Sequence, residues 1–158
     1  MGYQIGICDT MFARVDMFAI ADRAIKDSGE DILVERYTVP GVKDLPVAAK
    51  KLFEEHGCDI VLALGMPGKE SIDKMCSHEA SQGLIEVQLL ESKHILEIFV
   101  HLDEAKDEKD LLEIARRRTY DHTINAIALL KGKTELSEKA GKGIRQGRDN
   151  AGEIIWKE

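Results

Sequence analysis

Short apolar runs alternate with longer amphipathic stretches along most of this chain. Four runs of β-branched and aliphatic residues predict strands over residues 3–8, 32–39, 59–64 and 95–100. Between and after these runs, apolar residues recur at intervals of three and four, which predicts helices over residues 17–28, 45–56, 72–90 and 112–130. Strand–helix alternation repeated four times predicts a parallel sheet with right-handed crossovers. The expected fold class is α/β, a three-layer α/β/α sandwich around a four-stranded parallel sheet.

Local signals place the helix ends and the buried faces. Asp44 stands where an N-cap belongs, and Pro46 follows in the first turn, where its missing N–H costs nothing. The period of the third helix predicts that Met75, Leu84 and Val87 face inward. We therefore expect each helix to bury one stripe against the sheet.

The apolar period stops near residue 131. The remaining segment, KGKTELSEKAGKGIRQGRDNAGEIIWKE, holds five glycines and no long apolar period. We expect one α/β domain over residues 1–132, followed by a Gly/Lys-rich C-terminal tail over residues 133–158 with one short helix around residues 135–140.

The charge balance excludes some partners. The chain has 22 Lys and Arg against 29 Asp and Glu, a formal net charge of -7, and this sign repels a phosphate backbone. We therefore expect no nucleic-acid partner. No basic region precedes an apolar run at the N-terminus, and no apolar stretch approaches the roughly 20 residues that span a bilayer. A cytoplasmic protein without a membrane partner is expected.

The three cysteines, Cys8, Cys58 and Cys76, lie inside or beside apolar runs. Their odd number and their apolar surroundings predict reduced thiols rather than a disulfide framework. Because no CxxC pair occurs, we predict no metal site.

The functional residues are expected at one edge of the sheet, because ligands of such sheets bind at the carboxyl ends of the strands. These ends lead into residues 9–14, 40–44, 65–71 and 101–104. Phe12 offers an aromatic face to a flat heterocycle, and His101 is a group suited to moving protons near neutral pH. The turn at residues 65–71 does not match a phosphate loop, because Glu70 follows Lys69 where Ser or Thr is required.

Three consecutive arginines, Arg116, Arg117 and Arg118, fall in the fourth predicted helix. Three adjacent helical residues span about 200° of arc, so they cannot all face one ligand. We expect at most one of them to have a functional role.

One long stretch resembles a known family. The sequence TVPGVKDLPVAAKKLFEEHGCDIVLALG is similar to the lumazine synthase superfamily, whose members carry a VPG-x-x-[ED]-[IL]-P-x-A-x-K signature, a YDxVIALG-like strand and a later NEAxxG helix. Here the last motif is HEASQG, residues 78–83. Together with CDTMFARVD and the GMPGK turn, the chain resembles the archaeal type of riboflavin synthase over about residues 5–130, and the pattern continues through AGKGIRQG, residues 140–147.

The resemblance implies a transferase. In this reaction one molecule of 6,7-dimethyl-8-ribityllumazine transfers a four-carbon unit to a second, so that the acceptor becomes riboflavin and the donor becomes 5-amino-6-(D-ribitylamino)uracil. The electron-poor ring acidifies its own C7 methyl group, so a modest base is sufficient. Holding the two rings face to face can contribute ~7 to 11 kcal/mol through proximity.

Two departures from lumazine synthase favour this activity. That enzyme uses a phosphorylated sugar, a His before the third helix and an Arg in the last helix. No His occurs between Gly65 and Met75, and Asp110 falls near the position of the Arg, where its charge would repel a phosphate. A lumazine synthase and a flavin- or lumazine-binding protein without turnover stay open as alternatives.

The resemblance also implies a ring-shaped homo-oligomer, a pentamer, whose sites are shared between neighbours. One subunit would supply the loops after its first three strands, and the other would supply Phe99 and His101. The residues expected to bind substrate are Thr10, Phe12, Arg14, Pro40, Gly41, Val42, Asp44, Gly65, Met66, Pro67, Gly68 and Phe99. Those expected to transfer protons are His101, Lys43 and His78. No cofactor is expected to be required, and the sequence leaves open whether a divalent cation assists.

Overall fold

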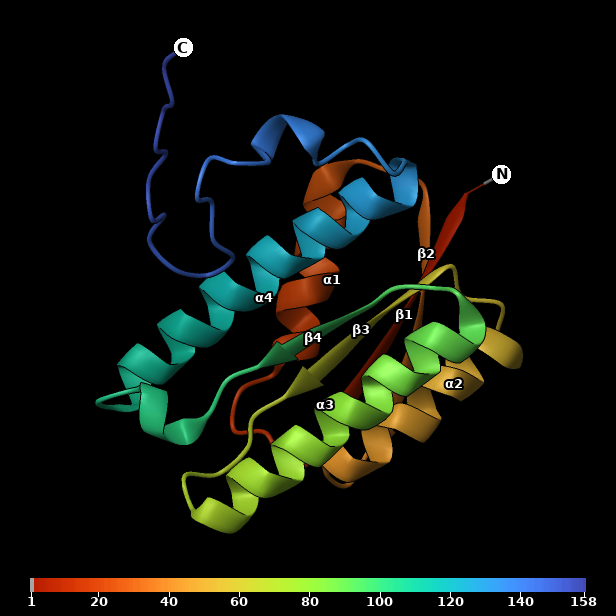
Figure 1. The fold of residues 1–158 in the computed structure, drawn as a ribbon. Helices are drawn as coiled ribbons and strands as arrows, with labels where there is room; N and C mark the ends of the chain where they lie inside the picture. Colours follow the sequence, from red (N-terminus) through yellow and green to blue (C-terminus); the bar gives the residue numbers. More distant parts are fainter. Residues whose placement is uncertain (1) are drawn as a thin grey trace.

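The computed structural model describes residues 2–158 and shows one four-stranded parallel sheet between two layers of helices (Figure 1). The fold class predicted from the sequence is confirmed. The strands are β1 (Tyr3–Thr10), β2 (Ile32–Val39), β3 (Ile60–Gly65) and β4 (Ile95–Phe99). The helices are α1 (Met17–Ser28), α2 (Leu45–Glu54), α3 (Ser71–Glu91) and α4 (Glu108–Lys131). Single 3-10 turns lie in the connections, at η1 (Val42–Asp44), η2 (Leu102–Glu104) and η3 (Ser137–Lys139).

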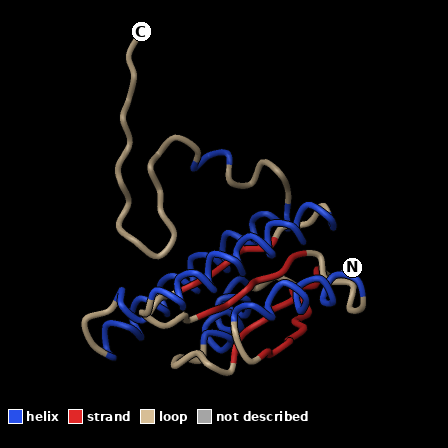
Figure 2. Tube along the Cα trace, turned by 60° about the horizontal axis from the view of Figure 1, so that its bottom comes forward, coloured by secondary structure: helices blue, strands red, loops and turns tan. Residues whose placement is uncertain are grey.

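The strand order is β2-β1-β3-β4, and every neighbouring pair is parallel. Helices α1 and α4 cover one face of the sheet, and α2 and α3 cover the other (Figures 1 and 2). The chain moves one way along the sheet from β1 to β2 and the opposite way from β2 to β4. Right-handed crossovers then place α1 on the face opposite α2 and α3.

Each face of the sheet has its own apolar core, because successive strand residues point to opposite faces. The core under α1 and α4 includes Ile7, Met17, Leu62 and Ile127. The core under α2 and α3 includes Leu52, Val61, Ala63 and Leu84. Helices on both sides bury every residue of β3, and this explains its unbroken apolar sequence.

One local prediction holds for position only, and another was wrong. Asp44 is the N-cap residue of α2, with Pro46 in the first turn, but its side chain accepts no hydrogen bond from a helix N–H, because the 3-10 turn η1 leads straight into α2 with Asp44 already in a helical conformation. Met75 is 58% exposed, since α3 packs through the stripe that contains Ser77, Leu84 and Val87. Met75 therefore lies on the outer face of α3.

Helix α4 begins four residues before its apolar period. The carboxylate of Asp107 accepts a hydrogen bond from the backbone N–H of Asp110 at 2.8 Å and caps the first turn. The charged residues before Leu112 therefore belong to the helix.

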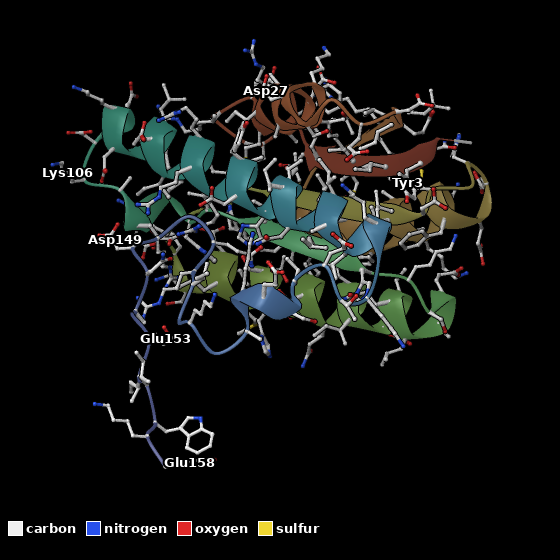
Figure 3. All side chains as sticks on the ribbon, turned by 90° about the horizontal axis from the view of Figure 1, so that it is seen from above. Tyr3, Asp27, Lys106, Asp149, Glu153 and Glu158 are labelled. Carbon is white, nitrogen blue, oxygen red and sulfur yellow. The ribbon has the colours of Figure 1, made fainter. Side chains whose placement is uncertain are left out.

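The segment after α4 returns along that helix. The backbone N–H of Gly147 donates to Asp121 at 2.8 Å, and Arg117 lies 3.1 Å from Asp149. From Asp149 the chain leads away from the helices through Glu153 (Figure 3). The short helix expected at residues 135–140 is a single 3-10 turn, η3. A domain boundary at residue 132 stays a prediction.

Within residues 2–158, no helix combines the length and the hydropathy needed to cross a membrane.

The contact between α2 and α3 predicts a sensitive position. A Cβ atom added at Gly83 would lie 2.8 Å from Cγ of Pro46. We expect Gly83→Val to lower the free energy of unfolding by about 1–3 kcal/mol relative to Gln82→Val, which introduces the same side chain on the exposed side of the same helix. Urea unfolding of both variants measures the difference, and equal stability would show that the two helices separate freely.

Candidate functional site

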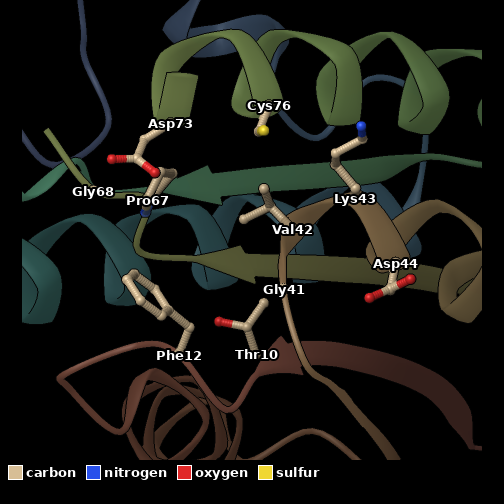
Figure 4. Close-up of a pocket in the computed structure, with 10 residues that line it drawn as sticks. All are labelled: Thr10, Phe12, Gly41, Val42, Lys43, Asp44, Pro67, Gly68, Asp73 and Cys76. Atoms are coloured by element: carbon tan, nitrogen blue, oxygen red, sulfur yellow. The ribbon is translucent and has the colours of Figure 1, made fainter. Parts of the chain in front are cut away.

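The carboxyl ends of β1, β2 and β3 surround a cavity of about 250 Å³ with a mainly apolar lining (Figure 4). The residues that line it are Thr10, Phe12, Gly41, Val42, Lys43, Asp44, Pro67, Gly68, Asp73 and Cys76. All of these except Asp73 and Cys76 are among the site residues expected from the sequence. The cavity therefore lies at the edge of the sheet that the strand pattern indicates.

The cavity forms where the chain diverges. Strands β1 and β3 are neighbours, but the loop after β1 leads to α1 on one face and the loop after β3 leads to α3 on the other. Such a reversal leaves a crevice outside the strand ends. Figure 4 shows Thr10 and Phe12 on one side of this opening, with Asp73 and Cys76 of α3 on the other.

An ion pair between a buried carboxylate and an exposed arginine fixes the end of β1. Asp9 is 7% exposed and accepts hydrogen bonds from the Arg36 guanidinium at 2.7 Å and the Thr38 hydroxyl at 2.6 Å, both on β2. The hydrogen bond to Asp9 raises the pKa of Arg36. These bonds hold the base of the loop that carries Phe12, whose side chain is 59% exposed and free to stack on a ligand.

The loop after β2 contributes Val42 and a paired cation. Lys43 Nζ lies 3.1 Å from the Glu79 carboxylate of α3, and this hydrogen bond raises the pKa of Lys43. The Glu79 carboxylate therefore favours the protonated form of Lys43. Its part in the cavity is that of a cation held on the rim.

The start of α3 adds Asp73, which sequence reasoning missed. The Asp73 carboxylate accepts a hydrogen bond from the backbone N–H of Glu70 at 3.0 Å, forming a capping box at the helix N-terminus. Gly68 permits this, because a Cβ there would lie 2.3 Å from Asp73 Oδ2. The spacing of Glu70 and Asp73 just before an amphipathic stretch was the sequence signal for this cap.

The other expected site residues do not line the cavity. Gly65 and Met66 are buried behind it, and the Arg14 guanidinium pairs with Glu108 at the start of α4. Pro40 is exposed, and His78 is exposed on α3. Phe99 and His101 lie at the end of β4, outside the lining, so in one chain they do not meet the substrate-binding residues.

The end of β4 is organised around Arg118. Its guanidinium donates to the backbone oxygen of Phe99 at 2.8 Å and to both carboxylate oxygens of Glu104 at 2.9 Å. Glu104 in turn accepts from the backbone N–H of His101 at 2.8 Å. Burial would raise the pKa of Glu104, but the hydrogen bonds from Arg118 and His101 outweigh it and hold this pKa below its usual value. Of the three arginines, Arg118 is the one that reaches the strand ends.

A second carboxyl group, Glu97, lies half-buried in the middle of β4. It accepts a hydrogen bond from the Ser81 hydroxyl of α3. Burial raises the pKa of Glu97, and the Ser81 hydrogen bond and the charge of His101 only partly oppose this. Ionised Glu97 therefore lowers the free energy of unfolding.

Residues 2–158 bring together no group of three or more His, Cys, Asp or Glu side chains that could hold a metal ion.

The family model for 6,7-dimethyl-8-ribityllumazine synthase matches residues 2–135, most of the chain. This chain belongs to the 6,7-dimethyl-8-ribityllumazine synthase family. The match includes all four strands and all ten residues of the cavity. The resemblance stated from the VPG and HEASQG motifs is thereby confirmed.

Relatives of different names match different shares of this chain. The riboflavin synthase of Methanothermobacter marburgensis is 51% identical over 96% of this chain and 99% of its own length. The riboflavin synthase of Archaeoglobus fulgidus is 46% identical over 96% of this chain and 99% of its own length. The 6,7-dimethyl-8-ribityllumazine synthase of Burkholderia mallei strain SAVP1 is 31% identical, over 56% of this chain and 54% of its own. Similarity to the proteins named riboflavin synthase therefore extends through the tail.

The environment of Glu97 predicts a pH-dependent stability. Below the usual Glu pKa of 4.5 the side chain is protonated in both the folded and unfolded states, so the wild type incurs no cost. As the pH rises through the raised folded-state pKa, the folded protein must ionise a half-buried group and loses stability. We expect Glu97→Gln to raise the melting temperature at pH 7 and to leave it unchanged at pH 4.

Thermal unfolding at both pH values, at one protein concentration, checks this expectation. The control is Glu86→Gln on the exposed side of α3. A Glu97→Gln variant less stable than the wild type at pH 7 would show that the charged form is favoured at this site.

Proposed function

We propose that this chain is a riboflavin synthase, a transferase that converts two molecules of 6,7-dimethyl-8-ribityllumazine into riboflavin and 5-amino-6-(D-ribitylamino)uracil. The observation that carries the proposal is the similarity, at 46–51% identity over 96% of the chain, to proteins of that name. The apolar cavity at the strand ends is compatible with a flat, uncharged heterocycle.

The size of the cavity supports a site shared between subunits. Pockets for drug-sized ligands usually enclose roughly 300–1,000 Å³, and the part of this cavity that one chain forms encloses about 250 Å³. One chain therefore has room for about one lumazine, and a second ring needs a surface from elsewhere. Phe99 and His101, which one chain leaves outside its own cavity, are the groups that a neighbour would bring in a homopentamer.

The cavity residues have clear parts in such a reaction. Phe12 would stack on the first lumazine, and Thr10, the Asp44 carboxylate and the backbone of Gly41 would bind the ribityl hydroxyls. His101 of the neighbour would exchange a proton with the C7 methyl group, which the ring itself acidifies. Lys43, kept protonated by Glu79, would stabilise negative charge rather than accept a proton. Proximity of the two rings would supply much of the rate.

The charges around the cavity bear on the alternative activity. The family model carries the name of lumazine synthase, whose reaction would use a sugar phosphate. The cavity lining holds two carboxylates, Asp44 and Asp73, against the single cation Lys43, which Glu79 already pairs. A dianionic phosphate would meet an unfavourable field there. We therefore place riboflavin synthase first.

Location and cofactor requirement belong to the same proposal. Cys8, Cys58 and Cys76 are free thiols, and burial raises the pKa of Cys58 to about 11, which keeps this thiol protonated and unreactive. Free thiols of this kind suit the reducing cytoplasm. We propose a cytoplasmic enzyme that needs no organic cofactor, and comparing turnover before and after dialysis against EDTA tests whether a divalent cation assists.

Turnover of the lumazine alone tests the function. We expect the purified protein, given only 6,7-dimethyl-8-ribityllumazine, to form riboflavin, followed by its absorbance. Product that appears only when the pyrimidine and the sugar phosphate are supplied instead would identify a lumazine synthase. A chromophore that stays tightly bound without turnover would identify a binding protein.

Phe12 provides the sharpest variant within the cavity. Stacking of a heterocycle on an aromatic side chain contributes about 1–3 kcal/mol, so Phe12→Ala should lower kcat/KM by roughly 5- to 100-fold, and Phe12→Tyr should retain most of it. Leu33→Ala, another exposed apolar position but on β2, is the control. Equal kcat/KM for Phe12→Ala and the control would exclude stacking on Phe12.

A further inference from the structure

The turn after β4 is attached to the wall of the cavity. The backbone N–H of Val100 donates to Gly65 at 3.0 Å, and that of Leu102 donates to Pro67 at 3.0 Å. Pro67 lines the cavity, so the turn and the cavity wall share a backbone hydrogen bond. The turn that carries His101 is therefore part of the rigid frame of the site rather than a free loop.

Side chains from both helix layers hold the same turn. Lys74 of α3 lies 2.6 Å from the Asp103 carboxylate, and Arg118 of α4 binds Glu104 through two parallel hydrogen bonds of 2.9 Å. The Lys74 pair is exposed, and such pairs contribute little. The Arg118 side chain is only 11% exposed and that of Glu104 30%, so this pair has both the geometry and the burial to fix a position.

Glu104 connects the arginine to the imidazole. Its Oε2 accepts from the His101 backbone N–H at 2.8 Å and lies 3.8 Å from His101 Nδ1. The charged groups around His101 are Glu104 and Asp103 of η2, Glu97 of β4, and Arg118 of α4 behind Glu104. Lys74 of α3 neutralises Asp103. The imidazole of His101 therefore lies near several carboxylates. Arg118 neutralises Glu104, the nearest of them.

We propose that Arg118 and Glu104 are positioning residues for the riboflavin synthase reaction, holding His101 at the place and angle in which it serves the neighbouring site. This inference rests on the proposed function. Arg118 fixes the Glu104 carboxylate, and Glu104 holds the His101 backbone N–H and lies beside the His101 ring. Neither residue lines the cavity.

The chemistry of the pair explains why an arginine stands at residue 118. A planar guanidinium binds one carboxylate with two parallel bonds and retains a donor for the Phe99 carbonyl, which a lysine ammonium cannot match in geometry. The adjacent arginines have other partners, since Arg116 pairs with Glu113 on the surface and Arg117 with Asp149 of the tail. Arg116 is thus a matched control on the same helix.

The charges of Arg118 and Glu104 predict the direction in which each variant shifts the pH–rate profile. If neutral His101 is the active form, activity rises with pH as the ring loses its proton. Removing Arg118 leaves Glu104 unbalanced, which favours the protonated ring, so Arg118→Gln should move the acid limb of the pH–rate profile to higher pH. Glu104→Gln removes the nearest carboxylate and exposes the ring to Arg118, so it should move the same limb to lower pH.

The variants are Arg118→Gln, Arg118→Lys, Glu104→Gln and the control Arg116→Gln, each assayed for kcat from pH 5 to 9 with the lumazine at saturation. We expect Arg118→Gln and Glu104→Gln to lose 10- to 100-fold in kcat with little change in KM, because a small misplacement of a reacting group has effects of this size. Arg118→Lys should recover part of kcat, and Arg116→Gln should match the wild type.

Shifts of the acid limb in the same direction, or no shift in either variant, would overturn the proposal, because a purely structural role gives no reason for opposite signs. If Arg118→Gln does not fold, the kcat and the acid limb measured for Glu104→Gln and Arg118→Lys test the proposal instead. If the wild type does not turn over the lumazine, the proposed function fails separately. The ring titration of His101 followed by NMR in the same variants then decides whether this pair controls the histidine.

Discussion

The parallel pairing of β1 with strands on both of its sides is the constraint on which the site depends. Thr10 of β1 pairs with Val39 of β2, and Cys8 of β1 pairs with Ala63 of β3, two residues before Gly65. Gly65 in turn pairs with Phe99. All four strands therefore end at one level. Because β1 and β3 send their helices to opposite faces, a crevice opens at that level between their loops, and the cavity lies there.

The polar groups near this crevice are arranged so that few charges are unbalanced. Lys43 is paired with Glu79, Asp9 with Arg36, and Glu104 with Arg118. The floor and walls are left mainly apolar. Such a site recognises a ligand by shape and by hydroxyl contacts, and the Asp44 and Asp73 carboxylates on its lining disfavour a phosphate. This suits a flat ring with a polyol chain better than a phosphate ester.

The sequence predicted the elements well and the side-chain arrangement less completely. Strand positions and helix faces follow from apolar spacing, which is a local property, and the edge that carries the cavity follows from strand–helix alternation. Asp73 was not predicted at the site, because the spacing of a capping box occurs at many places in a sequence. Arg118 was not predicted there, because its role depends on contacts with Phe99 and Glu104, which lie in other elements. Met75 was misplaced because apolar spacing does not reveal which of two adjacent stripes faces the core.

The half-buried carboxylate on β4 has a consequence beyond its own hydrogen bond. β2 and β4 are the outer strands of the sheet, and such strands present unpaired backbone groups that can recruit strands from other molecules. A charge in the middle of such a strand opposes this, since a newcomer would have to desolvate it. Glu97 on β4, and Glu35 with Arg36 on β2, therefore protect the open borders of the sheet against aggregation when the protein is concentrated.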